Sequence, residues 1–144
     1  MAHGNAMATR LVLDAWPIME WFRGSEPASS SFRALLTDAA RGRVVLCISR
    51  INLGEIFYMT AKTFGDAVAS SLVQQLTSIF IEVVSVTDAD IDAAARLKAR
   101  YRISYADAFA AVLSMTRDAA LVTGDSDFQQ LLPTESLRLH WLGA

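Results

Sequence analysis

Short apolar runs alternate with longer amphipathic segments along most of the 144-residue chain. The apolar runs have the length of buried strands and are bounded by polar or turn residues. We expect strands over residues 10–14, 44–48, 79–86, 119–123 and 137–142. The segments between them repeat apolar residues with helical periodicity. We expect helices over residues 28–40, 52–63, 66–78, 90–101 and 104–117.

This alternation of strands and helices predicts an α/β sandwich. Parallel neighbouring strands need crossover connections, which the intervening helices supply, so we expect a mostly parallel central sheet of about five strands. In such folds ligands bind at the carboxyl ends of the strands. We interpret residues 10–144 as a single domain. We expect residues 1–9 to be an N-terminal tail, part of which was added for expression of the protein.

The composition indicates a well-filled core, with 53% hydrophobic and 19% charged residues. The longest apolar stretches, 44–48 and 108–115, fall far short of the roughly 20 residues that span a bilayer, so no membrane association is expected. The N-terminus lacks the basic start and apolar run of a signal peptide. Cys47 is the only cysteine and lies in an apolar strand, which excludes an intramolecular disulfide. We therefore expect a cytoplasmic protein.

Four acids occupy positions where an α/β fold builds its sites. Asp14 ends the first predicted strand, and Asp125 follows the fourth. Glu55 lies among apolar neighbours in the helix after the second strand, and Asp107 lies in the first turn of the helix before the fourth. We expect these side chains to converge at the carboxyl edge of the sheet, together with Asp127.

Carboxylates brought together in this way repel one another, by roughly 4 kcal/mol per pair at 4 Å in an effective dielectric near 20. A divalent cation relieves that repulsion, and oxygen-only ligands suit Mg²⁺ or Mn²⁺. Such an ion activates water and holds the oxygens of a phosphodiester, which is nuclease chemistry. The two histidines, His3 and His140, lie in the predicted tail and the last strand, so histidine-based zinc or acid/base sites are disfavoured.

The net charge of the whole chain is −2, which argues against a polyanionic partner. Removing the five candidate carboxylates, which bound cations would neutralise, leaves a charge of +3 for the rest of the chain. That balance is compatible with an RNA substrate.

Each aspartate also has a purely structural interpretation. Asp14 is placed to cap a helix that has Pro17 in its first turn. Asp107 follows Ser104 at the spacing of a capping box, and Asp125 and Asp127 are placed to cap a short helix. The sequence leaves both interpretations open for these residues.

Four motifs together resemble the PIN-domain family, and in particular the VapC-type toxins of toxin-antitoxin pairs. They are LVLD (11–14), NLGEI (52–56), ISYADAFAA (103–111) and LVTGDSDF (121–128). The resemblance implies a PIN-like α/β/α sandwich and an endoribonuclease that uses Mg²⁺ or Mn²⁺. It implies Asp14, Glu55, Asp107 and Asp125 as the catalytic acids, with Asp14 and Asp107 as the foremost metal ligands and Asp125 and Asp127 beside them.

The resemblance also implies an orienting role for Thr123, a homodimer, and a small antitoxin partner that holds the pair on promoter DNA. Ala15 departs from the family, where serine or threonine is common, and its missing hydroxyl is expected to weaken the ordering around the metal. Two other functions remain open: an RNA-processing PIN nuclease that is not a toxin, and a non-catalytic regulatory binding module.

Overall fold

The computed structural model describes residues 8–79 and 81–144. Most of the predicted N-terminal tail, including its suggested expression remnant, lies outside the described residues, and Thr9 already belongs to the first strand. No helix in the described part of the chain is long and apolar enough to cross a membrane.

The predicted five-stranded parallel sheet is confirmed. Its strands are β1 (Thr9–Leu13), β2 (Val44–Ser49), β3 (Ile81–Val84), β4 (Ala120–Thr123) and β5 (Leu139–Trp141). They lie in the order β3-β2-β1-β4-β5, and all four neighbouring pairs are parallel. The edge strands β3 and β5 are shorter than the predicted ranges 79–86 and 137–142, since pairing on one side leaves their ends outside the ladder.

Helices connect the strands, as the alternating pattern predicted. They are α1 (Ala15–Arg23), α2 (Ala28–Ala40), α3 (Arg50–Phe64), α4 (Asp66–Ser78), α5 (Asp88–Arg100), α6 (Tyr105–Thr116) and the 3₁₀ helix η1 (Ser126–Leu131). The predicted helices 28–40 and 66–78 match α2 and α4 at both ends.

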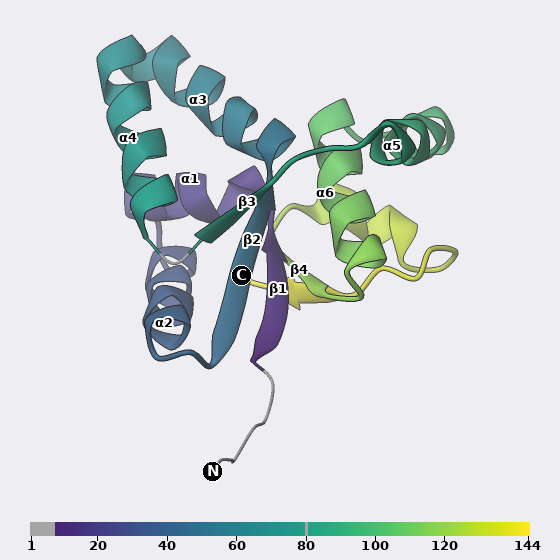
Figure 1. The fold of residues 1–144 in the computed structure, drawn as a ribbon, viewed down its shortest axis with the longest axis horizontal. Helices are drawn as coiled ribbons and strands as arrows, with labels where there is room; N and C mark the ends of the chain where they lie inside the picture. Colours follow the sequence, from purple (N-terminus) through teal and green to yellow (C-terminus); the bar gives the residue numbers. More distant parts are fainter. Residues whose placement is uncertain (1–7, 80) are drawn as a thin grey trace.

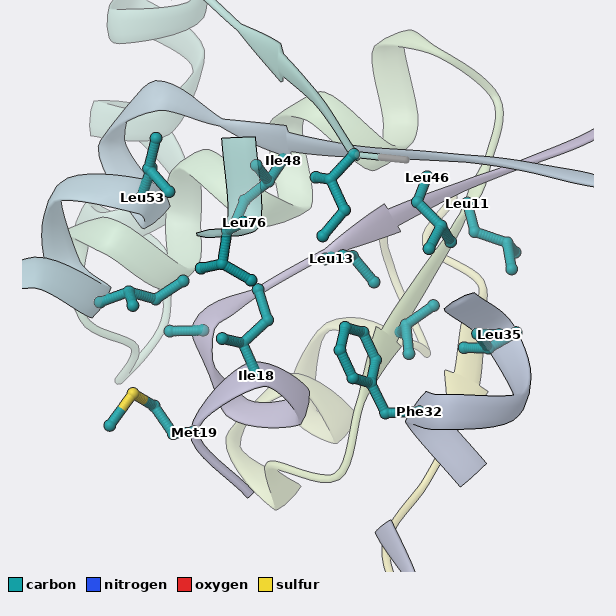
Figure 2. Packing of buried hydrophobic residues seen from close by; sticks show 14 of the residues in the cluster. Leu11, Leu13, Ile18, Met19, Phe32, Leu35, Leu46, Ile48, Leu53 and Leu76 are labelled. Carbon is teal, nitrogen blue, oxygen red and sulfur yellow. The ribbon is translucent and has the colours of Figure 1, made fainter. Parts of the chain in front are cut away.

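Helix α1 was not among the segments predicted from helical periodicity, and only the capping interpretation of Asp14 placed a helix there. It is only nine residues long and has no acid in its first turn, so its local signals are weak. Its stability comes from packing, because Ile18 and Met19 are buried in the apolar cluster shown in Figure 2.

Helices cover the two faces of the sheet (Figure 1), and one apolar cluster lies on each face. Helices α1–α4 pack on one face, where Leu13 and Ile48 point, whereas α5, α6 and η1 pack on the other, where Val12 and Cys47 point. The alternation of neighbouring strand residues between the two clusters follows the period of two in a β-strand. Burial on both faces explains why the strands are continuous apolar runs.

The strand order sets where a site can form. The chain leaves β1 towards β2 and β3 on one side, and returns to pair β4 on the other side of β1. Leu13 of β1 is in register with Val122 of β4, so Asp14 and Thr123 follow side by side at the carboxyl end of the sheet. This change of direction is the position at which open α/β sheets bind ligands.

Candidate active site

Asp14 lies at the carboxyl end of β1 and is only 2% exposed. It is the N-cap of α1, because its Oδ1 accepts a hydrogen bond from the backbone N–H of Trp16 at 3.0 Å. Its Oδ2 accepts a hydrogen bond from the Thr123 hydroxyl at 2.9 Å. The capping interpretation is therefore correct, and the same side chain also faces the end of β4.

Thr123 connects the ends of β1 and β4 through its hydroxyl. It is fully buried, and its Oγ1 donates to Asp14 and accepts from the backbone N–H of Asp125 at 3.0 Å. Asp125 in turn caps η1, since its Oδ1 accepts from the N–H of Asp127 at 2.9 Å. This chain of hydrogen bonds orders three of the predicted site acids along one edge.

Gly124 allows the loop between Thr123 and Asp125 to lie close to α1. A Cβ atom at this position would lie 2.3 Å from Cη2 of Trp16. The indole ring therefore packs directly against the glycine backbone, and this contact depends on the missing side chain.

Asp107 enters the same edge from the first turn of α6 and is 9% exposed. The Ser104 hydroxyl accepts a hydrogen bond from the N–H of Asp107 at 3.1 Å. In α5 the capping box is complete, because the Thr87 hydroxyl accepts from the Asp90 N–H and the Asp90 carboxylate accepts from the Thr87 N–H. The described residues of α6 show only the hydrogen bond from the Asp107 N–H to the Ser104 hydroxyl. The carboxylate of Asp107 is thus free of the capping role that its spacing suggested.

The carboxylates of Asp107, Asp125 and Asp127 come closest together. One oxygen from each lies within 4.8 Å of the others. Asp14 lies outside this tight group of described residues, although it was predicted as a ligand beside them. Glu55 lies on α3, partly buried, and its Oε1 is 3.4 Å from Nδ2 of Asn52.

The electrostatics show that all five acids share one environment. Burial, followed by the charges of Asp125 and Glu55, raises the pKa of Asp107 from 3.8 to about 7. Burial is also the largest cause that raises the pKa of Asp14 well above its usual range, and the charges of Asp107 and Glu55 add to it. Hydrogen bonds from Thr123 and Trp16 oppose that rise.

The pKa of Glu55 is raised in the same way, first by burial and then by the Asp125 charge, against the hydrogen bond from Asn52. The predicted convergence of acids that lie far apart in the sequence is therefore present in the fold.

The sequence profile of the PIN domain family matches residues 11–131, a range that holds all five acids. The chain belongs to the PIN domain family. A comparison with curated protein sequences found no match.

Solved structures share the fold at low sequence identity. A chain of VapBC2 from Rickettsia felis, bound to a DNA fragment from its promoter, is 17% identical with a TM-score of 0.68, and the match covers 92% of this PIN domain and 98% of that chain. VapC20 from Mycobacterium tuberculosis, a toxin that cleaves the sarcin-ricin loop, is 17% identical with a TM-score of 0.69 and coverage of 83% and 93%. A chain of DNA-bound VapBC from Salmonella typhimurium is 19% identical with a TM-score of 0.68 and coverage of 92% and 97%.

The donor set of this PIN domain fits a hard divalent cation. Asp107, Asp125 and Asp127 offer only carboxylate oxygens, which are the ligands that Mg²⁺ and Mn²⁺ prefer. Burial, followed by the charges of Asp125 and Glu55, disfavours the ionised form of Asp107. A bound cation would favour that ionised form.

Two residues of this site escaped the sequence analysis. Gly124 and Asn52 were each treated only as part of a motif. Asn52 is fully buried on α3, three residues before Glu55 and on the same face of the helix. A polar residue one helical turn from a candidate acid, within an apolar helix face, is the signal that could have identified it.

Proposed function

We propose that this PIN domain is a metal-dependent endoribonuclease and the toxin of a VapBC-like toxin-antitoxin pair. The observation that carries the proposal is the grouping of oxygens from Asp107, Asp125 and Asp127 within 4.8 Å of one another. After burial, the Glu55 charge adds to the rise in the pKa of Asp107, and the Asp107 charge adds to the rise in that of Asp14. Family membership supports a nuclease, since the match includes every acid of this group.

Asp107, Asp125 and Asp127 would hold the cation, and Asp14 would complete its surroundings. Both oxygens of Asp14 already accept one hydrogen bond, but a carboxylate has about four lone-pair positions, so it retains capacity for a ligand. Bound Mg²⁺ or Mn²⁺ would lower the pKa of a water molecule and hold the phosphodiester oxygens in line.

The chain's own residues would prepare this site. The Thr123 hydroxyl fixes the orientation of Asp14 and of the Asp125 backbone. Asp107, a proposed catalytic acid and ligand, is held in the first turn of α6, where the Ser104 hydroxyl accepts a hydrogen bond from its backbone N–H. Glu55 faces the same charges from α3 and is the fourth proposed catalytic acid.

The toxin assignment draws on the structural relatives. Two of them are VapBC complexes on DNA, and the matches cover 97–98% of those chains. We propose that residues 10–144 act as one domain that forms a homodimer in the cytoplasm, binds a small antitoxin and reaches promoter DNA only through it. RNA would be the substrate, as it is for the sarcin-ricin loop cleaving relative.

Two other functions make different predictions. An RNA-processing nuclease would cleave RNA without arresting growth and would have no antitoxin gene beside its own. A regulatory binding module would bind Mn²⁺ and cleave none of a varied set of RNAs.

The central experiment compares Asp14→Asn and Asp107→Asn with the wild-type chain in RNA cleavage with Mn²⁺. We expect both variants to lose cleavage and to keep the circular dichroism spectrum of the wild type. Asp92→Asn is the matched control, because Asp92 is exposed on α5 and takes no part in the acid group. Full activity in both site variants would refute the assignment, and induction without an antitoxin would separate toxin from processing enzyme by growth arrest.

A further inference from the structure

Asn52 links the helix of one site acid to the helix of another. It lies on α3 and is fully buried. Its side-chain Nδ2 donates a hydrogen bond to the backbone oxygen of Ala106 in α6 at 3.0 Å, and it lies 3.4 Å from Oε1 of Glu55. Ala106 directly precedes Asp107, so a single amide group contacts both sides of the acid group.

The two contacts determine how the amide is oriented. The Ala106 carbonyl oxygen and the Glu55 carboxylate are both acceptors, so only the NH₂ side of the amide can satisfy them. One amide hydrogen then points to the Ala106 carbonyl and the other to Glu55, and the hydrogen bond to Glu55 favours the charged form of that carboxylate.

A role in folding alone explains this residue poorly. The Oδ1 atom of Asn52 is buried and has no hydrogen-bond partner among the described residues, which costs stability. The Ala106 oxygen does not depend on Asn52, because a carbonyl in the first turn of a helix accepts from the N–H four residues later. An apolar side chain of similar size would fill the same space without the unpaired oxygen.

We propose that Asn52 is a positioning residue that sets the separation between Glu55 on α3 and Asp107 on α6. This inference rests on the proposed function, since it assigns Asn52 a part in the same metal-binding site. Its effect is exerted through the two acids, and Asn52 itself contacts neither the ion nor the RNA.

The test measures Mn²⁺ affinity of the full chain by electron paramagnetic resonance and calorimetry. Asn52→Leu keeps the number and branching of the side-chain heavy atoms and removes both hydrogen bonds, and Asn52→Ala removes them without adding bulk. We expect both variants to bind Mn²⁺ about 10-fold more weakly, the lower end of the range for groups that order a metal site, because the bond to Ala106 holds the turn of α6 that carries the ligand Asp107.

Thr60→Val is the matched control. Thr60 is equally buried on α3, but its hydroxyl lies 3.8 Å from the sulfur of Met19, on a part of the helix that contacts α1. We expect this variant to lose stability without a change in Mn²⁺ affinity.

The outcomes separate this inference from the proposed function. Wild-type affinity in a folded Asn52→Leu or Asn52→Ala chain would overturn the positioning role, whether or not RNA is cleaved. If neither variant folds, the role of Asn52 is structural and the positioning role is overturned. Absence of Mn²⁺ binding by the wild type would overturn the positioning role as well. Weakened Mn²⁺ binding in the variants, with no RNA cleavage by the wild type, would support Asn52 and refute the nuclease.

Discussion

Replacing Asp107 by asparagine should make the metal-free protein more stable at neutral pH and above. Burial and the neighbouring acids raise the pKa of Asp107 from 3.8 to about 7, so the folded state holds its proton more tightly than the unfolded state does. The free energy of unfolding must then fall as pH rises from about 4 to about 7. In this range the unfolded chain has released the Asp107 proton while the folded chain still holds it.

The size of this effect follows from the two pKa values. A tenfold change in an ionisation constant corresponds to about 1.4 kcal/mol, so the difference between 3.8 and about 7 corresponds to about 4 kcal/mol. The side chain is only 9% exposed, so solvent screens little of it. The Asp107→Asn chain lacks this ionisation, and we expect it to gain up to about 4 kcal/mol over the wild type between pH 4 and pH 8.

Urea unfolding in the presence of a chelator, followed by circular dichroism at pH 4, 6 and 8, measures the difference. Asp92→Asn, which removes an exposed acid outside the acid group, serves again as the control. Excess Mn²⁺ should stabilise the wild type at pH 8 far more than it stabilises Asp107→Asn, because a ligand that binds the folded state adds to its stability. A difference between wild type and Asp107→Asn that does not change with pH would refute the claim that repulsion and burial act on this carboxylate.

Three further changes test how the site is supported. Thr123→Val should weaken Mn²⁺ binding by about 10-fold or more, because Asp14 loses a hydrogen bond that orients it; unchanged affinity in calorimetry would contradict this. Gly124→Ala should cost about 1–3 kcal/mol in urea unfolding, since its Cβ would lie 2.3 Å from Trp16 and the ring must move, and an unchanged midpoint would contradict the close packing. Phe128→Ala should cost about 3–5 kcal/mol from the cavity it leaves, because Phe128 is fully buried; a loss below 1 kcal/mol would show that the core collapses around it.

The strands and most helices could be predicted because their signals are local. Strands buried on both faces need continuous apolar runs, which β1, β2 and β4 supply, and α2 and α4 end at clear changes in polarity. The start of α6 follows from the hydroxyl N-cap at Ser104, whereas α5 begins at Asp88, before the predicted start at residue 90, because Thr87 is its N-cap. Periodicity did not identify helix α1, which only the capping interpretation of Asp14 indicated, because its nine residues depend on contacts with α2 and α3 rather than on propensity.

The sequence by itself determined which acids stand at the ends of strands and in first turns, because the period of each element assigns every residue a face and an end. It did not determine which of these acids meet. That was decided by the strand order, which places β1 beside β4 and joins Asp14 to Thr123, and by the packing of α3 against α6, which brings Asn52 to Ala106. Such contacts join residues 54 and 109 positions apart, and only the folded chain brings them within hydrogen-bonding distance.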